Sequence, residues 1–454
     1  MDACVVTCFL RDRGEVLLRR RSEGTDSAPG RWDAITGRVD GDRDPDAAAH
    51  EAIAAETGLD AAALVRRGEP FATGGADGET RRIHPYSFDC ERRAIESNGA
   101  TNHEWTHPTE IRRRETVPGL REAYERVAPT VETVASDAEH GAATISVRAL
   151  EVLRDRAGAL ADRWADGGSD DRGGTDDCEA NYQSVDGSGV DGRGENWTKL
   201  AALARDLRAA RPSMVVVENR INRAMSAAAR ERGQRGAAMA VERAARAGIE
   251  RACTADEGAA RAAAGRLDGA RVLTLSRSST VRRALRRAAP ERVLVAESRP
   301  AREGVGVAEA LVGDNMDVTL LVDAAVAHVL AERGFDAVLV GADTVLPDGT
   351  LVNKVGTRAA ALAAAREGVP LYVVAATDKI GTRDEPDFEA GDPRAVYDGD
   401  APLDAANPTF DATPPDLLAG FLTEEGPLDP GAAGAVAAEL RALADWPGSG
   451  CSAG

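Results

Sequence analysis

The pattern of hydrophobic and polar positions changes at about residue 270. From there on, short runs rich in valine, leucine and alanine alternate with amphipathic helical stretches. Continuous apolar strands separated by helices are typical of a parallel sheet that is covered on both faces. The expected strands are 271–274, 292–296, 318–322, 337–340 and 371–374, and the expected helices are 279–288, 324–333 and 357–367.

Polar residues follow these expected strands directly. In a parallel α/β sheet, ligands bind beyond the carboxyl ends of the strands. We therefore expect the residues that bind a ligand among those that come straight after each run: residues 276–280, residues 297–299, Asp323, Asp343 and Lys379.

The chain before residue 270 has a different pattern. Its first part has β-like runs at 3–10 and 15–18 and one helical stretch near 45–57, whereas later residues favour helices, as at 146–160 and 197–210. Residues 166–196 are dense in Gly, Asp and Ser, and we expect them to form a solvated, disordered insertion. The sequence thus predicts an α/β multidomain protein with an N-terminal domain (1–128), a helical domain (129–265), a parallel-sheet domain (266–440) and a flexible tail (441–454).

The composition indicates the kind of environment and the classes of partner that the protein is suited to. The net charge is −19 and nearly all basic residues are arginine, because Lys199, Lys354 and Lys379 are the only lysines. Such a surface is typical of halophilic proteins that stay soluble in concentrated salt, and without a basic stripe direct nucleic-acid binding is not expected. The six cysteines are scattered, no apolar run approaches the length of a membrane span and no signal peptide is recognisable. We therefore expect a cytoplasmic protein without a membrane partner.

Five ordered segments resemble a known family. They are similar to the "RPT…N", "LTHSYSSTV", "ESRP…EG", "GAD…NKIGT" and "NPxFDxTPPDLI" signatures of the translation initiation factor 2B alpha/beta/delta family, which also contains ribose-1,5-bisphosphate and methylthioribose-1-phosphate isomerases. The resemblance implies a helical domain followed by a Rossmann-like domain. The matching residues are 211–214 with Asn219, 273–281, 297–300 with 303–304, 341–343 with 353–357, and 407–416.

The residues in these segments suit a phosphorylated small molecule. The hydroxyls that open the helix at 279 and its free N–H groups could bind phosphate, and Lys354 and Lys379 could supply compact cationic contacts. The alternative is that the Ser-Ser-Thr and Gly-Thr sequences only cap helices. With the family's phosphate-binding "RGA", present here as His140-Gly141-Ala142, the candidate ligand-binding residues are His140, Gly141, Arg211, Ser278, Ser279, Thr280, Asn353, Lys354 and Lys379.

Two further residues bear on catalysis. In the family's aldose-phosphate isomerases, a cysteine after the first strand and the aspartate of "GAD" exchange protons with the sugar. Asp343 matches the aspartate, but Ser276 stands in the cysteine position, and a hydroxyl is a very weak acid without a base nearby. Serine at this position resembles the initiation-factor branch of the family.

The N-terminal domain resembles a second family, Nudix, with an α/β/α sandwich fold. Residues 14–21 and 30–33 are similar to its "VLLxxR" strand and "GxW" turn, and residues 37–59 have the length of the Nudix box. Active members hold Mg²⁺ on glutamates of this box and hydrolyse a nucleoside diphosphate linked to another group. Glu56 matches, and Glu104 resembles a further glutamate of some members, but Ala52 and Ala55 stand where two metal-binding glutamates belong.

Two functions therefore compete. The first is a regulatory, non-catalytic protein of the initiation factor 2B type that binds a sugar phosphate or nucleotide and carries a degenerate Nudix module. The second is an enzyme: a Nudix pyrophosphohydrolase with Mg²⁺ on Glu56 and Glu104, or an aldose-phosphate isomerase that uses Asp343 and Ser276. The resemblance also implies a homo-oligomer formed through the C-terminal domain, and translation initiation factor 2 as a candidate partner.

Overall fold

The computed structural model describes residues 3–24, 28–41, 43–59, 62–74, 80–90, 93, 102–166, 188–332, 334–386, 388 and 390–449. The chain forms two compact units, each built from separate stretches. Unit 1 comprises Met1–Thr130, Glu151–Leu200 and Glu231–Arg246, and unit 2 comprises Val131–Leu150, Ala201–Arg230 and Ala247–Gly454. The long helices are shared between the two units, and the domain boundaries at 128, 265 and 440 stay predictions.

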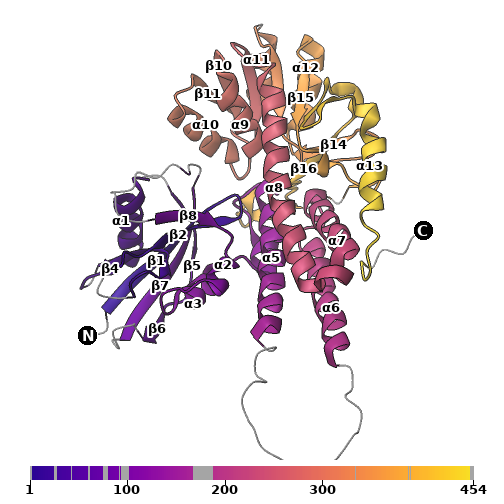
Figure 1. The fold of residues 1–454 in the computed structure, drawn as a ribbon. Helices are drawn as coiled ribbons and strands as arrows, with labels where there is room; N and C mark the ends of the chain where they lie inside the picture. Colours follow the sequence, from indigo (N-terminus) through magenta and orange to yellow (C-terminus); the bar gives the residue numbers. More distant parts are fainter. Residues whose placement is uncertain are drawn as a thin grey trace, which may run out of the picture. The chain divides into compact units, whose positions relative to one another are not determined.

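Unit 1 is built on an eight-stranded mixed sheet (Figure 1). The central strand β1 pairs antiparallel with β2 and β4 and parallel with β7. The sheet order is β3-β2-β1-β7-β5, with β4 on β1, β6 on β7 and β8 on β2. The strands are β1 Ala3–Asp12, β2 Glu15–Arg20, β3 Trp32–Asp33, β4 Ile35–Val39, β5 Ala63–Arg67, β6 Phe71–Gly74, β7 Thr80–Asp89 and β8 Asn102–Thr106.

Alternating side chains of this sheet fill two separate cores. Val6, Cys8 and Leu17 pack with helix α1 (Pro45–Thr57) in one core, and Phe9 and Leu18 pack in the other with α2 (Glu110–Arg113) and α3 (Leu120–Val127). Because neighbouring residues of a strand point to opposite faces, this alternation produces three layers. The layers form an α/β/α sandwich.

Local sequence signals explain where α1 begins, ends and packs. Asp44 caps its N-terminus, with its side chain accepting from the Asp46 N–H at 3.2 Å, and Gly58 ends it at a φ of 68°. A Cβ atom at Gly37 of β4 would lie 2.8 Å from the Ala52 Cβ, so only glycine allows α1 to approach this closely.

Unit 2 contains the parallel sheet predicted from the alternating pattern. All five predicted strands are present, and they pair in parallel in the order β11-β10-β9-β12-β15, followed by parallel β17 and antiparallel β18. Their bounds are β9 Arg271–Leu275, β10 Arg292–Ala296, β11 Val318–Leu321, β12 Ala337–Val340, β15 Leu371–Val374, β17 Gly420–Thr423 and β18 Gly426–Leu428.

Helices cover both faces of this sheet (Figure 1). On one face pack the end of α8 (Ala237–Ala264), α9 (Ser279–Ala288) and α10 (Glu303–Gly313). On the other pack α11 (Val326–Ala331), α12 (Thr357–Glu367) and α13 (Ala433–Ala442). A small antiparallel sheet joins β13 (Thr344–Val345), β14 (Leu351–Lys354) and β16 (Phe410–Thr413). Short 3₁₀ helices are Asp323–Ala325, Thr377–Lys379, Pro393–Ala395, Pro415–Leu417 and Pro430–Ala432.

The predicted helical region contains helices at 131–264. They are α4 (Val131–Ser136), α5 (Ala142–Asp166), α6 (Ser188–Ala209), α7 (Val215–Arg235) and α8 (Ala237–Ala264). Residues 167–187 of the expected disordered insertion lie outside the described residues. For residues 188–196 the prediction of disorder is wrong, because these residues form the start of α6. Extending an existing helix by one residue costs far less free energy than nucleating one, so α6 continues into this polar stretch.

The prediction of a flexible tail at 441–454 is also wrong as far as residue 449. Trp446 is only 2% exposed, and its indole N–H donates to the Asn222 side chain at 3.0 Å. Arg208 donates to the Ser449 carbonyl at 3.0 Å. Burial of a large aromatic ring together with a satisfied N–H holds this segment against the other helices of unit 2. Residues 450–454 lie outside the described residues.

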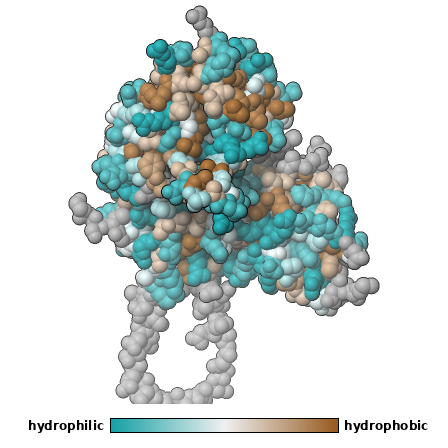
Figure 2. Space-filling model, turned by 180° about the vertical axis from the view of Figure 1, so that it is seen from behind, coloured by the Kyte–Doolittle hydropathy of each residue, from teal (hydrophilic) through white to brown (hydrophobic). Residues whose placement is uncertain are grey.

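On the face that Figure 2 shows, hydrophilic side chains predominate and hydrophobic ones are interspersed among them. Among the described residues, the helices include none that is both long and apolar enough to cross a bilayer.

Candidate functional site

Four neighbouring strands of unit 2 end side by side with polar residues after them. β10, β9, β12 and β15 are consecutive in the sheet, with Ala296 opposite Leu275 and Val340 opposite Val373. The sequence therefore brings residues 276–280, 297–303, 341–343 and 377–379 to one edge. We call this edge the strand-end site.

The segment 341–343 lies at the centre of the strand-end site. A Cβ atom at Gly341 would lie 2.7 Å from the Ser278 Oγ, so the β9 loop packs against its backbone. The Lys379 ammonium donates to the Ala342 carbonyl, and the Asp343 N–H donates to the Val352 carbonyl at 3.1 Å. Several residues predicted from the sequence to bind a ligand are thus brought together here.

Lys379 is the most buried cation of this edge. Its side chain is almost inaccessible, with a relative exposure of 4% for the residue. Burial lowers the pKa of Lys379, while the negative charges of Asp343 and Asp256 raise it and Arg220 lowers it further. A buried ammonium whose charge is only partly supported by the protein would gain from an anionic ligand.

A second set of buried charges lies beside Lys379 and was not predicted from the sequence. Arg220 of α7 pairs with Asp256 of α8 at 3.0 Å and with Asp378 at 3.4 Å, and it also donates to the Ser146 hydroxyl at 2.8 Å. Burial raises the pKa of Asp378, but Arg220 and Arg223 outweigh it, so that the pKa lies below its ordinary value. We call Arg220, Asp256 and Asp378 the Arg220 cluster.

Asn353 and Lys354 end β14 and are held by their surroundings. The Asn353 amide donates to the Thr357 hydroxyl at 3.0 Å, and the Lys354 ammonium pairs with one oxygen of Glu303 at 2.8 Å. The other Glu303 oxygen is buried and has no hydrogen-bond partner among the described residues. This pair is therefore incompletely satisfied, and Lys354 has donors left for a further anion.

Ser276 occupies a strained turn and has no base in place. Its φ of 62° is left-handed, and its N–H donates to the Ser298 hydroxyl at 2.7 Å. Ser298 has the same φ, and its N–H donates to Asp323 at 2.8 Å. Within the described part of the chain, the Ser276 hydroxyl makes no hydrogen bond to a carboxylate or imidazole. Strain of this kind is frequent at functional sites, but the acid/base pair of an isomerase is not assembled around this hydroxyl.

The residues that open α9 behave as helix caps. The Ser278 Oγ accepts from the Val281 N–H at 3.3 Å, and Thr280 is only 1% exposed. The capping alternative therefore holds for Ser278, whereas Ser279 is half-buried. The N-terminal N–H groups of this ten-residue helix still lie at the strand-end site.

The His140-Gly141 segment meets the same edge through Arg277. The Arg277 guanidinium donates to the Ala138 carbonyl at 3.0 Å, and a Cβ atom at Gly141 would lie 3.7 Å from the Arg277 carbonyl. Asp137 accepts from the His140 ring at 2.9 Å. Burial raises the pKa of Asp137, but the hydrogen bonds and charges of His140 and Arg148 hold it well below its usual range.

Arg148 places a guanidinium next to the histidine that replaces the family's arginine. Its terminal nitrogens lie 3.1 Å from the His140 Nδ1 and 3.3 Å from the Nε2. Arg211 reaches the same turn and donates to the Asp137 and Val134 carbonyls, the latter at 3.2 Å. Positive charge is thus retained in this part of unit 2 although residue 140 is not an arginine.

A small cavity adjoins these elements. Its volume is about 10 Å³, roughly the space of one water molecule, and it is lined by residues that follow Arg211, Asp343 and Lys379 in the sequence. The residues that line it include Ser213, Thr344, Val352, Gly381, Arg383 and Glu385. Its lining combines polar and charged groups with small apolar ones.

In unit 1, the remaining glutamate of the Nudix box is paired internally. One Glu56 oxygen lies 2.9 Å from the Arg19 guanidinium and the other lies 3.3 Å from the His103 Nε2. Burial raises the pKa of Glu56, although Arg19 and His103 lower it. We call Arg19, Glu56 and His103 the Arg19 cluster. Its Arg19 Nε and His103 Nδ1 are buried without a hydrogen-bond partner among the described residues.

The predicted metal pair is not available to Mg²⁺. Arg114 holds both oxygens of Glu104, at 2.9 and 2.6 Å, and thereby lowers the pKa of Glu104. Glu51, which is exposed, pairs with Arg43 rather than with the residues around Glu56. Among the described residues there is no group of three His, Cys, Asp or Glu side chains that could hold a metal ion. Because Arg19 already neutralises Glu56, this donor set does not fit Mg²⁺.

Unit 1 nevertheless contains a larger cleft. Its volume is about 80 Å³, and its lining includes apolar residues such as Ile83, Val117 and Leu120. The lining also includes Arg21, Arg81, Asp33 and the hydroxyls of Thr7, Thr36 and Thr73. Arg21 is fixed by Asp33 at 2.6 Å. Apolar walls with a few oriented polar groups are typical of small-molecule sites.

Comparison with known proteins adds the family. A sequence model described as "Initiation factor 2 subunit family" matches residues 138–430, and one described as "NUDIX domain" matches residues 2–127. The translation initiation factor eIF-2B of Pyrococcus horikoshii OT3 has a similar fold, with a TM-score of 0.52 and 22% identity over 66% of this chain and 95% of that one. The 5-methylthioribose 1-phosphate isomerase of the same organism has a TM-score of 0.51 and 20% sequence identity, and the match covers 76% of this chain and 91% of that one.

Curated relatives match a shorter stretch. Methylthioribose-1-phosphate isomerase of Stutzerimonas stutzeri is 38% identical over 146 residues, which is 30% of this chain and 41% of the relative. Ribose 1,5-bisphosphate isomerase of Haloferax volcanii is 38% identical over 146 residues, 30% of this chain and 45% of the relative. The chain thus covers less than half the length of these curated relatives.

Proposed function

The chain belongs to the initiation factor 2 subunit family, and we propose that it binds a phosphorylated small molecule, a sugar phosphate or a nucleotide, at the strand-end site in a regulatory role. The observation that carries this proposal is the position of Lys379, buried beside Asp343 with its ammonium on the Ala342 carbonyl. The negative charge of a phosphate group would stabilise the buried Lys379 ammonium.

The distribution of lysine supports the same ligand. The chain has three lysines, and two of them belong to the strand-end site or to β14 next to it. Lys354 shares its charge with a Glu303 carboxylate that has one buried oxygen without a partner among the described residues. The N-terminal N–H groups of α9 would contribute further donors.

The test uses the third lysine as a matched control. We would follow the thermal unfolding of the full chain in concentrated salt with ribose 5-phosphate, ribose 1,5-bisphosphate and AMP. Lys354→Ala should weaken binding about tenfold or more, because a hydrogen bond to a charged group is lost. Lys199→Ala removes an exposed lysine that pairs with Glu195, so its affinity should equal that of the unmodified chain. Equal affinity in both variants would contradict the proposal.

The alternative is an aldose-phosphate isomerase of the ribose-1,5-bisphosphate isomerase type. Asp343 and the isomerase relatives favour it, whereas the Ser276 hydroxyl without a base opposes it. The sugar phosphates would be incubated with the protein and followed by phosphorus NMR. We expect binding without turnover; isomerisation that disappears in Asp343→Asn would establish the enzyme instead.

For the Nudix domain we propose a binding module rather than a pyrophosphohydrolase. The cleft of unit 1 combines two guanidinium groups with an apolar wall, which suits an anion with a planar or apolar body, such as a nucleotide. The Arg19 cluster supplies no metal site for hydrolysis. ADP should therefore stabilise the protein without release of phosphate when Mg²⁺ is added, and Arg21→Ala should abolish the stabilisation.

The family resemblance also supports a homo-oligomer formed through the C-terminal domain. Edge strand β11 and the neighbouring end of α10 expose Leu320, Val322 and Val312, at 43%, 57% and 58%. Light scattering should give more than one copy per particle, and Leu320→Asp should lower that number. Translation initiation factor 2 stays a candidate partner, to be tested by binding to this oligomer.

A further inference from the structure

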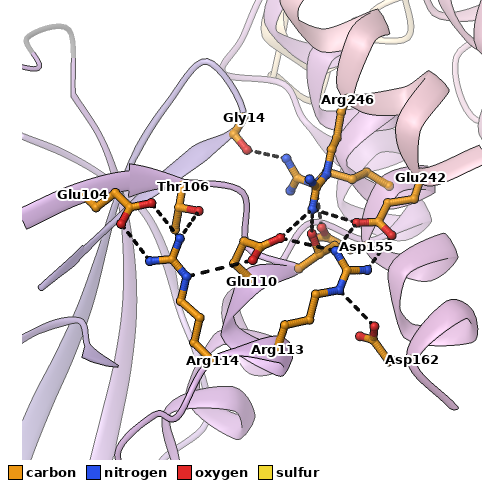
Figure 3. A network of polar contacts seen from close by, with 12 residues as sticks. Gly14, Glu104, Thr106, Glu110, Arg113, Arg114, Asp155, Asp162, Glu242 and Arg246 are labelled. Atoms are coloured by element: carbon orange, nitrogen blue, oxygen red, sulfur yellow. Dashed lines mark hydrogen bonds and ion pairs between the residues drawn. The ribbon is translucent and has the colours of Figure 1, made fainter. Parts of the chain in front are cut away.

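A group of shared ion pairs surrounds the short helix α2 in unit 1 (Figure 3). It consists of Thr109, Glu110, Arg113, Arg114, Glu242 and Arg246, and we call it the α2 junction. Glu110 is approached by three guanidinium groups: Arg246 at 3.1 Å, Arg113 at 3.3 Å and Arg114 at 4.0 Å. Glu110 is thus shared among three guanidinium groups, so a change in one of these pairs would affect the other two.

The second carboxylate of the junction belongs to α8. Glu242 accepts two hydrogen bonds from Arg113, at 2.9 and 2.6 Å, and pairs with Arg246 at 2.7 Å. Burial raises the pKa of Glu242, but these arginines outweigh it and keep the carboxyl ionised. A Cβ atom at Gly158 of α5 would lie 2.5 Å from Thr109 and 3.5 Å from Glu242, so α2 is wedged tightly between α5 and α8.

From the α2 junction, a short stretch of backbone leads to the cleft of unit 1. The Arg114 guanidinium lies 4.5 Å from the centre of the Trp32 ring. Trp32 exchanges backbone hydrogen bonds of 2.9 Å with Glu115 and Val117, and Val117 lines the cleft. Asp33, which follows Trp32, also lines the cleft. A ligand that displaces Val117 or Asp33 would act on the backbone that carries Trp32, against which Arg114 packs.

In the other direction, α8 continues from the α2 junction into unit 2. The helix runs unbroken from Ala237 to Ala264. Glu242 and Arg246 belong to its unit 1 part, and Asp256 belongs to its unit 2 part. Asp256 is paired with Arg220, whose other partner Asp378 precedes the ligand-binding candidate Lys379. A shift of α8 would thus alter the charges beside Lys379.

We propose that the α2 junction is a switch through which occupancy of the unit 1 cleft changes α8 and, with it, the strand-end site. The inference rests on the proposed ligand binding and gives the fused Nudix module its role as a regulatory input. Occupancy shifts the pairing of Glu110 among its three arginines, and Arg113 and Arg246 carry the change to Glu242. By linkage, the strand-end ligand must alter the affinity of the cleft by the same factor.

Other contacts of unit 1 hold the Nudix module without reaching α8. Arg11 pairs with Glu151, and the Tyr124 hydroxyl donates to Asp155 at 2.8 Å, both on α5. Loss of these contacts would weaken the packing of the Nudix module against α5 but would leave the pairing in the α2 junction unchanged. Tyr124→Phe is therefore the control that separates a switch from a simple attachment.

The experiment measures amide hydrogen exchange of the full chain in residues 253–264, about two turns beyond Arg246 on α8. Glu110→Gln changes the α2 junction at a residue outside the segment that is measured, and it should speed exchange in residues 253–264 about fivefold or more. Glu242→Gln should do the same. Tyr124→Phe, and Arg243→Gln on α8 outside the junction, should leave it unchanged. Changes confined to residues 102–130 and 237–246 would overturn the inference.

A second arm uses ADP as the probe for the cleft. In the unmodified chain, ADP should slow exchange in residues 253–264, and in Glu110→Gln this protection should disappear while protection around the cleft persists. Equal protection of 253–264 in both proteins would overturn the switch. If ADP protects no segment, the proposed cleft ligand is wrong, whereas the first arm still decides whether the α2 junction controls α8.

Discussion

Two arginine-centred clusters, one in each unit, use the same kinds of group and differ in how completely they are satisfied. In the Arg220 cluster, all three guanidinium nitrogens bond to partners within the chain, and the side chains are 1–4% exposed. In the Arg19 cluster, the exposures are 8–20%, and Arg19 Nε and His103 Nδ1 have no hydrogen-bond partner among the described residues. Complete satisfaction is typical of a structural role, whereas buried polar atoms without a partner are rare in purely structural clusters.

The two clusters differ in hydrogen-bond satisfaction because their surroundings differ. Arg220 joins three elements of unit 2, and the second carboxylate of its cluster, Asp378, is also bonded by Arg223 at 2.8 Å. Arg19 lies where the Nudix box has lost two glutamates, at Ala52 and Ala55, and it supplies internally the positive charge that a metal would bring. The Arg19 cluster thus pairs its carboxylate internally, whereas the Arg220 cluster lies beside Lys379 of the strand-end site.

The largest expected effect tests the structural role of Arg220. Arg220→Ala leaves Asp256 and Asp378 buried, and removal of one partner from a buried ion pair costs about 3–5 kcal/mol. We expect denaturant unfolding, followed by fluorescence of the buried Trp446, to shift by this amount. Arg223→Ala is the matched control, because Arg223 pairs with the same Asp378 but is 26% exposed. A loss no greater than that of the control would remove the distinction between the clusters.

What could be predicted from the sequence depended on whether a feature was local. The strands of unit 2 are apolar on both faces, as in β12 and β15, so each was visible as a run of four or five residues. β13 has two residues and acquires its structure only by pairing with β14, which no local pattern announces. The burial of Trp446 likewise depends on Asn222, 224 residues away in the sequence.

The same reasoning applies to the candidate sites. Lys354 and Lys379 were recognisable because lysine is scarce in this chain. Arg19, Arg148 and Arg220 were not, because arginine is abundant and their partners are set by the fold; Arg220 and Asp378 are 158 residues apart. The contact of His103 with Glu56 likewise requires β8 to lie beside β2, which no local pattern announces. The loss of the box glutamates was visible in the sequence, but their replacement by Arg19 was not.

A smaller effect of opposite sign is expected in the Arg19 cluster. Burial raises the pKa of Glu56 in the folded state, so this group stabilises the fold fully only below its unfolded pKa, about 4.3, and loses that stabilisation as pH rises through the folded value. Glu56→Gln should therefore stabilise unit 1 at neutral pH by about 0.5–2 kcal/mol. The gain should vanish below about pH 4. Destabilisation at neutral pH would mean that the Arg19 pair outweighs burial.

The smallest effect concerns Glu104, whose two oxygens are held by Arg114 at the surface of unit 1. Its side chain is 47% exposed, so Glu104→Gln should cost only about 0.2–1 kcal/mol, measured by thermal unfolding at fixed salt. Added MgCl₂ should change the melting temperature of the unmodified chain and of this variant equally, because Arg114 and Arg19 already neutralise the two carboxylates. A Mg²⁺ stabilisation that is lost in Glu104→Gln would show that the metal displaces the arginines. The Arg19 cluster would then be a closed form of a working site, and the contrast with the Arg220 cluster would be one between a switchable and a fixed set of charges.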